Sequence, residues 1–108
     1  MRTLQINGKK NERYKVLLCG TIISIKINKG LKTFKNQNGY HTVTIYSKGL
    51  KKTYCVHRLV AETYYGKCPK GKEVNHKDRD RYNNAPYNLE YITHRENMIH
   101  LSQTKKAG

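Results

Sequence analysis

The sequence predicts an α+β fold in which an N-terminal antiparallel β-sheet is followed by a short hairpin and a helix. Apolar and polar residues alternate along residues 21–27 and 40–46, which is typical of half-buried strands. The period changes to that of a helix over residues 57–65, and residues 93–96 form a helix-start signal. With 108 residues, the chain is long enough for one domain with a modest core and too short for two ordinary domains.

The sheet is expected within residues 14–56, as an antiparallel meander with one packed face and one wet face. Isoleucine occupies every second position from Ile23 to Ile27, with polar side chains between them. Val43 and Ile45 alternate in the same way with threonines. These apolar residues are therefore predicted to face the core.

Turn residues flank the second of these strands, because Asn38-Gly39 precedes it and Lys48-Gly49 follows it. The next segment, residues 57–65, places Leu59, Val60 and Tyr64 on one helical face. Gly66 is a suitable C-terminal stop for that helix. A basic loop is expected after it.

Two short strands are expected at residues 74–75 and 90–92, joined by a polar stretch. The sequence Thr-x-x-Glu from Thr93 predicts a second helix that begins at His94 and runs to about Gln103. The predicted organisation is one compact unit with three parts: residues 1–56 as a basic sheet, residues 57–104 as a core of hairpin and helices, and residues 105–108 as a tail.

The charge is strongly positive, with 22 Lys+Arg against 7 Asp+Glu and a net charge of +15. Such an excess favours a polyanionic partner, of which nucleic acid is the first expectation and an anionic membrane the alternative. The sequence has no run of about 18 apolar residues that could span a bilayer. The N-terminus is polar by its fifth residue, so no signal peptide is expected and a cytoplasmic location is predicted.

The three cysteines form no Cys-x-x-Cys pair and are odd in number. A disulfide framework and a structural zinc ribbon are therefore not expected, and the thiols are predicted to be reduced. His57, His94 and His100 do not have the spacing of a converging zinc site, and His57 is expected to be a packed structural residue.

Residues 74–98 contain the most informative pattern in the chain. Asn75-His76 is followed by Asn88, 12 residues after the histidine (88 − 76 = 12), and by Asn97, 21 residues after it (97 − 76 = 21). This arrangement resembles the His-Asn-His/Asn motif of the HNH nucleases. The resemblance implies a ββα-metal motif that holds one divalent metal ion beside a general base, and it implies DNA cleavage.

Two further stretches extend the resemblance to phage and intron-encoded HNH homing endonucleases. YKVLLCGTIISI at residues 14–25 is similar to the strand module that often precedes the nuclease in that group. YCVHRLVAETYY at residues 54–65 is similar to the helix that leads into its catalytic hairpin. Together with the motif, the resemblance covers roughly residues 14–100. It implies that residues 57–104 form the nuclease core and that the basic sheet of residues 1–56 contacts DNA.

The resemblance implies a role for each residue of the motif. His76 becomes the general base, because an imidazole accepts a proton near neutral pH. Asn97 becomes a metal ligand through its carbonyl oxygen, which suits Mg²⁺ or Mn²⁺. Asn75 becomes the second ligand at a position that is often aspartate in the family, with Asp78 as the alternative acid or a turn former. Asn88 is expected to brace the loop at the catalytic site, with similar turn work from the neighbouring asparagines.

Basic residues on the expected sheet and around the expected active site are candidates for phosphate contacts: Lys26, Lys29, Lys32, Lys35, Lys51, Lys52, Arg79, Arg81 and Arg95. A two-stranded ribbon fits a major groove, so the sheet could also read bases. For any single lysine, a solvated surface is the alternative.

The sequence thus predicts a phage-encoded or homing-type endonuclease that hydrolyses double-stranded DNA with Mg²⁺ or Mn²⁺. A monomer with one active site is expected to nick one strand, whereas a double-strand break requires a dimer or two binding events. The alternative is a DNA-binding protein of the same fold with weak or no cleavage, which the asparagine at position 75 supports. A basic RNA-binding module is a third hypothesis.

Overall fold

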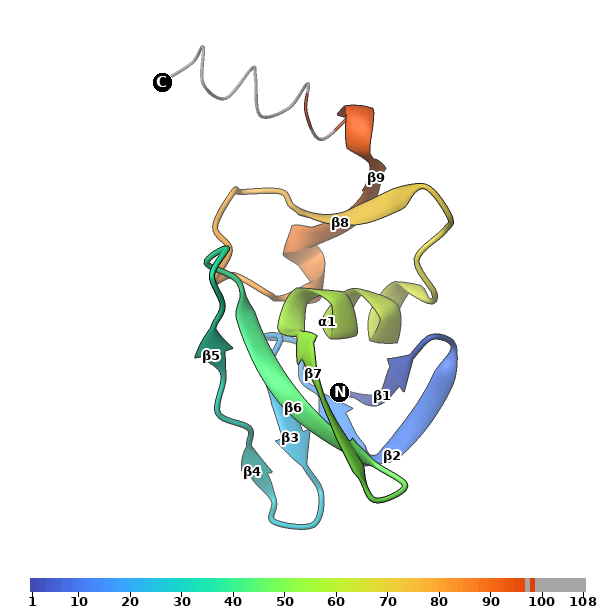
Figure 1. Cartoon of the computed structure of the whole chain (residues 1–108), viewed down its shortest axis with the longest axis vertical. Coiled ribbons are helices and arrows are strands. Elements are labelled where there is room, and N and C mark those ends of the chain that lie inside the picture. Colours follow the sequence, from blue (N-terminus) through green and yellow to red (C-terminus); the bar gives the residue numbers. More distant parts are fainter. Residues whose placement is uncertain (97, 99–108) are drawn as a thin grey trace.

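The computed structural model describes residues 1–96 and 98, and within that part it contains three antiparallel sheets and a ten-residue helix (Figure 1). The first sheet consists of β1 (Arg2–Ile6), β2 (Lys9–Val16), β3 (Ile22–Ser24) and β4 (Lys29–Gly30). The second consists of β5 (Phe34–Lys35), β6 (His41–Ser47) and β7 (Leu50–Cys55). Helix α1 (Val56–Tyr65) follows, and then β8 (Lys72–His76), the 3-10 turn η1 (Pro86–Asn88) and β9 (Leu89–Thr93), of which β8 and β9 form the third sheet.

Two hairpins have turns in which both central residues adopt left-handed backbone angles. The β1–β2 turn is Asn7-Gly8, with φ values of 53° and 79°, and the β6–β7 turn is Lys48-Gly49, with 51° and 79°. Such turns match the right-handed twist of the strands that they join. The prediction at Lys48-Gly49 is confirmed, whereas the N-terminal hairpin, which extends the sheet back to Arg2, was not predicted.

The core lies where α1 meets the sheets. Leu59 and Val60 are fully buried, so the predicted apolar face of the helix is confirmed. The helix packs on β1, and the β8–β9 hairpin lies on its other side (Figure 1). Tyr64 donates a hydrogen bond from its hydroxyl to the carbonyl of Val16 at 2.7 Å, which fixes the helix to the first sheet. The helix ends at the predicted glycine, since Gly66 adopts a φ of 88° and its N–H donates to the Glu62 carbonyl.

One strand differs from its prediction. β3 covers Ile22–Ser24 only, Ile22 is buried, and Ile25 and Ile27 are exposed. The chain leaves the strand after Ser24 and reverses at Asn28, which has a φ of 51°, before β4 begins. The predicted core role of Ile25 and Ile27 is therefore wrong, because alternation continued into a turn.

The second predicted strand is confirmed. β6 buries Val43 and Ile45 almost completely. The N–H of Tyr46, on the same strand, donates a hydrogen bond to the Tyr14 hydroxyl oxygen at 3.1 Å. That bond joins the first sheet to the second.

The C-terminal hairpin is longer than predicted on both strands. Its register pairs Asn75 with Glu90 and His76 with Leu89. The following residues are helical from His94 to Glu96, as predicted. The N–H of Glu96 donates to the Thr93 hydroxyl oxygen at 3.1 Å, and that hydroxyl donates to the Glu96 carboxylate at 3.0 Å. The predicted continuation to Gln103 lies outside the described residues.

Within the described part of the chain, no helix is long and apolar enough to cross a membrane.

Candidate active site

His76 is the last residue of β8, and its side chain is buried, with 5% of its surface exposed. Its Nε2 lies 2.7 Å from Oδ1 of Asn84. A carbonyl oxygen only accepts hydrogen bonds, so the neutral ring holds its proton on Nε2 and keeps a lone pair on Nδ1. Asn84 therefore selects the tautomer of His76, a more specific role than the turn work expected from sequence.

An aromatic cluster packs around the same imidazole. The ring centroid of His57 lies 5.1 Å from that of His76 and 4.7 Å from that of Tyr40. Burial, together with smaller contributions from the positive charges of His76 and Arg58, lowers the pKa of His57 to about 3. His57 is thus a packed, neutral residue at working pH, as expected.

Asn88 lies at the end of η1 and ties the loop that follows β8. Its Nδ2 donates to Oδ1 of Asp78 and to the carbonyl of Asn83, both at 2.9 Å. Its Oδ1 accepts from the N–H of Asp78 at 3.1 Å, and its own carbonyl accepts from the N–H of Lys77 at 2.7 Å. These contacts suit the bracing role predicted for Asn88.

Asp78 uses both carboxylate oxygens inside this loop. Oδ1 accepts from the N–H of Asp80 and from Asn88, and Oδ2 accepts from Nδ2 of Asn83. The hydrogen bond from Asn83, followed by those from Asp80 and Asn88, lowers the pKa of the Asp78 carboxyl. The geometry therefore favours the turn-forming alternative for Asp78.

Asn75 directly precedes His76 at the end of β8. It is 4% exposed, and its Nδ2 donates to Oε1 of Glu90, directly across the hairpin, at 3.1 Å. Sequence reasoning missed Glu90, because its neighbour becomes visible only with the strand register. Asn97, the other predicted ligand, lies outside the described residues.

The chemistry of the oxygen donors fits a hard divalent cation. Among the described residues, no hydrogen bond donor reaches Oδ1 of Asn75. An amide oxygen and a nearby carboxylate suit Mg²⁺ or Mn²⁺. Within residues 1–96 and 98, no three or more His, Cys, Asp or Glu side chains converge as a metal-binding group.

The predicted DNA-contacting lysines are all exposed: Lys26, Lys29, Lys32, Lys35, Lys51 and Lys52. The strand alternation of β7 places Lys51 and Lys52 on opposite faces, so one DNA surface cannot use both in the same way. Lys35 lies 5.1 Å from the centre of the Tyr82 ring, which brings the second sheet beside the loop after β8.

The three predicted arginines differ in environment. Arg81 donates to the carbonyl of Asn38 and lies over the Tyr40 ring at 4.7 Å, so it links the loop to the second sheet. Arg79 is half-buried, with a left-handed φ of 67°, and Arg95 is exposed on the first turn of the C-terminal helix.

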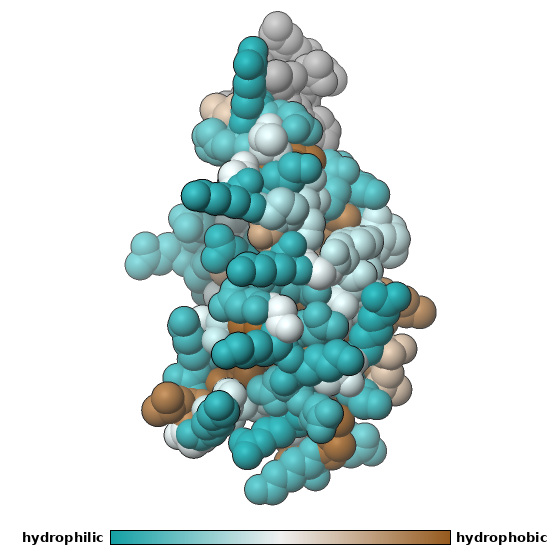
Figure 2. All heavy atoms as spheres, turned by 90° about the vertical axis from the view of Figure 1, so that its right-hand side faces the viewer, coloured by the Kyte–Doolittle hydropathy of each residue, from teal (hydrophilic) through white to brown (hydrophobic). Residues whose placement is uncertain are grey.

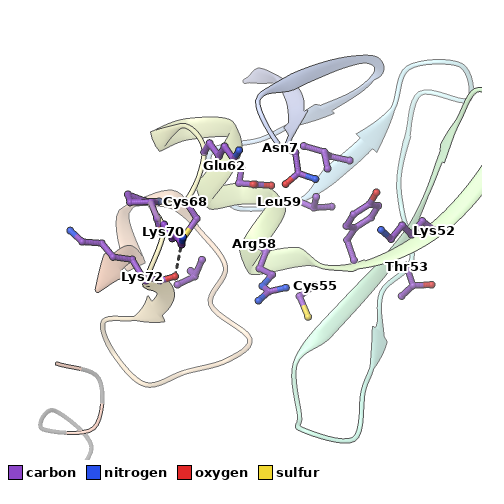
Figure 3. Close-up of a pocket in the computed structure, with 16 residues that line it drawn as sticks. Asn7, Lys52, Thr53, Cys55, Arg58, Leu59, Glu62, Cys68, Lys70 and Lys72 are labelled. Carbon is purple, nitrogen blue, oxygen red and sulfur yellow. Dashed lines mark hydrogen bonds between the residues drawn. The ribbon is translucent and has the colours of Figure 1, made fainter. Parts of the chain in front are cut away.

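A basic pocket of about 560 Å³ lies between α1, β7, the loop at residues 67–72 and the β1–β2 turn (Figure 3). Its cationic residues are Lys52, Arg58, Lys67, Lys70 and Lys72. Glu62 also lines it, and burial raises the pKa of that carboxyl. Figure 2 shows a predominantly hydrophilic face with scattered apolar residues. The sequence predicted Lys52 as a DNA contact and a basic loop at residues 67–72, but it did not predict that they line one pocket with Arg58.

Comparisons with known proteins place this geometry in a family context. Residues 54–99 match the family model described as HNH endonuclease. The chain is 45% identical over 83 residues to the SPbeta prophage-derived putative HNH homing endonuclease YosQ of Bacillus subtilis, covering 75% of this chain and 47% of the relative. It is 38% identical over 85 residues to DNA endonuclease I-HmuI of Bacillus phage SP01, covering 79% of this chain and 49% of the relative.

The fold matches a solved structure as well. The structure described as "DNA binding and cleavage by the HNH homing endonuclease I-HmuI" aligns with a TM-score of 0.82 and 33% identity, covering 97% of this chain and 60% of that one. The chain spans about half the length of the two curated relatives named above. The predicted resemblance and the α+β fold are thus confirmed: this chain contains the HNH endonuclease module, matched over residues 54–99.

Proposed function

We propose that this protein is a DNA endonuclease that hydrolyses phosphodiester bonds with the help of one divalent metal ion. The single observation that supports it best is the pairing of His76 with Asn84, because it leaves a proton-accepting nitrogen on a histidine at the motif position. The match of residues 54–99 to HNH endonucleases supports the same reaction class.

In this mechanism, Nδ1 of His76 takes a proton from water, and the resulting hydroxide attacks the phosphorus atom. The P–O3′ bond breaks, and the 3′-oxygen leaves with a proton from solvent. The Nε2–H of His76 remains hydrogen-bonded to Oδ1 of Asn84, and this bond stabilises the imidazolium that forms. Asn75 and, from the sequence, Asn97 would hold the cation, which supplies Lewis-acid stabilisation of the phosphate and the leaving oxygen.

The bracing contacts of Asn88 support this role for His76. They connect η1, immediately before β9, to the loop immediately after β8. That loop also holds Asn84, so a fixed loop keeps the acceptor of His76 in place. We assign Asn88 to this support rather than to proton transfer, because an amide does not titrate.

The exposed lysines and the arginines of the loop would hold double-stranded DNA through its phosphates. A chain with one active site would nick one strand as a monomer, and double-strand cleavage would require two such sites. Relatives named as phage and prophage proteins support a phage or homing origin.

A second candidate function is DNA binding with weak or no cleavage. Two observations favour it, namely the neutral asparagine at position 75 and the burial of His76. A supercoiled plasmid incubated with Mg²⁺ or Mn²⁺ separates the two functions. We expect open-circle product that disappears with EDTA, whereas intact plasmid with DNA still bound would establish the second function.

A further inference from the structure

The hydrogen bond between Asn75 and Glu90 connects the two strands of the hairpin at the residue before His76. The two residues are direct partners in the register, and Nδ2 of Asn75 donates to Oε1 of Glu90 at 3.1 Å. Asn75 is buried and Glu90 is half-buried. The pair is therefore partly shielded from solvent, which strengthens both the hydrogen bond and the electrostatic effect of the Glu90 carboxylate.

The direction of the Asn75 amide follows from this bond. The nitrogen and the oxygen of an amide share one carbon and lie in one plane, so a nitrogen held by Glu90 also aims Oδ1. Among the described residues, neither Oδ1 of Asn75 nor Oε2 of Glu90 accepts a hydrogen bond. These two oxygen atoms are thus available to coordinate a cation.

Glu90 brings a negative charge into contact with Asn75. Asn75 is neutral. Both carboxylate oxygens of Asp78 are used within the loop, where they accept three hydrogen bonds, from Asp80, Asn83 and Asn88. Glu90 is the carboxylate in hydrogen-bond contact with Asn75. A carboxylate beside a neutral ligand compensates part of the charge of a bound cation.

We propose that Glu90 is a positioning residue of the metal site, which aims the Asn75 oxygen at the cation and supplies the negative charge that an aspartate at position 75 would provide. This inference rests on the proposed function, because it assumes a divalent metal at Asn75. In this proposal, the Asn75–Glu90 pair together takes the place of a single acidic ligand.

The test measures Mn²⁺ binding without DNA, by titration followed with electron paramagnetic resonance, for the wild type and three variants. Glu90→Gln keeps an acceptor for Asn75 and removes only the charge, so Mn²⁺ affinity should fall about 10- to 100-fold. Asn75→Asp combined with Glu90→Gln restores one negative charge, with the introduced glutamine donating to the introduced aspartate. That double variant should recover most of the lost affinity.

Glu73→Gln is the matched control, because Glu73 is a second glutamate of the hairpin, on β8, and its carboxylate lies 3.5 Å from Nδ1 of His94, whereas the carboxylate that accepts from Asn75 is Glu90. Its Mn²⁺ affinity should stay close to that of the wild type. Thermal unfolding of each variant without metal is measured as well, so that a loss of Mn²⁺ affinity can be told apart from a loss of stability.

Three results would overturn the inference: unchanged Mn²⁺ affinity in Glu90→Gln, an equal loss in Glu73→Gln, or no recovery in the double variant. A wild type that retains no Mn²⁺ in the millimolar range would overturn it too. Plasmid nicking is measured separately. Nicking with Glu90-independent metal binding rejects this inference alone, and Glu90-dependent metal binding without nicking rejects the proposed function alone.

Discussion

His76 and Asn84 lie at opposite ends of the loop that follows β8, and a hydrogen bond of 2.7 Å joins Nε2 of the histidine to Oδ1 of the asparagine. Eight residues of sequence separate them, yet the loop returns so that the asparagine reaches the ring. The contact fixes which nitrogen holds the proton, and with it which nitrogen can serve as a base.

Replacement of Asn84 tests this contact. Asn84→Ala removes the acceptor of Nε2–H and frees the tautomer, so the nicking rate should fall by at least about tenfold, within the range of general-base contributions. DNA affinity, measured by mobility shift, should stay within a factor of about two. An unchanged nicking rate would show that Asn84 does not orient His76.

The backbone of Gly20 lies close to the backbone of Asn84. A Cβ at Gly20 would lie 2.4 Å from the Asn84 carbonyl oxygen, and the residue has a left-handed φ of 90°. Gly20→Ala should therefore destabilise the fold by more than the roughly 1 kcal/mol expected from backbone strain alone. It should also slow nicking, because it pushes on the segment that holds Asn84.

Gly49→Ala is the matched control for that variant. Gly49 also has a left-handed φ, 79°, but a Cβ there meets nothing within 4 Å. Thermal or urea unfolding should show a loss of roughly 1 kcal/mol and no change in nicking. Equal losses for both glycines would contradict the close contact at Asn84.

The buried His57 predicts an acid-sensitive fold. Its folded pKa of about 3 lies below its ordinary value of 6.5, so the unfolded chain binds the proton first as the pH falls. The free energy of unfolding is unaffected by His57 above about pH 6.5. As the pH falls from there towards 3, proton binding by the unfolded chain lowers the free energy of unfolding by an amount on the order of 4 kcal/mol. Urea unfolding across this pH range measures the effect.

His57→Phe should remove this part of the pH dependence while keeping an aromatic ring beside Tyr40. His94→Phe is the control, because the His94 side chain is 77% exposed and meets water in both states. If His57→Phe retained the acid sensitivity of the wild type, the neutral buried imidazole would not be its source.

The exposed lysines of the second sheet predict salt-dependent DNA binding. Lys51→Ala and Lys35→Ala should each weaken DNA binding by a similar factor whatever the sequence of the duplex. Each should also reduce the slope of log affinity against log salt by about one. The nicking rate at saturating DNA should not change. A substitution that leaves the salt slope unaltered would assign that lysine to the solvated surface.

Local patterns predicted much of this fold. The alternation at Val43 and Ile45, the helical period that ends at Gly66 and the Thr93 cap all appear where the sequence placed them. Alternation failed at Ile25, since a turn with Asn28 in a left-handed conformation ended the strand. Periodicity describes a strand but does not show where it stops.

The site was less predictable, because its contacts depend on register and loop closure. The motif spacing singled out His76, but its hydrogen bond to Asn84 requires the folded loop. Glu90 faces Asn75 only because of the pairing of β8 with β9. Asp78 was open between a ligand and a turn former, and its three hydrogen bonds favour the turn.

The most direct measurement compares the wild type with His76→Ala on one supercoiled plasmid preparation with Mg²⁺ or Mn²⁺, recording nicking and DNA binding together. We expect open-circle product for the wild type, none for the variant, and nearly equal DNA affinity for both. Equal nicking by both proteins would contradict the assignment of His76 as the base. Loss of DNA binding in the variant would make His76 structural instead.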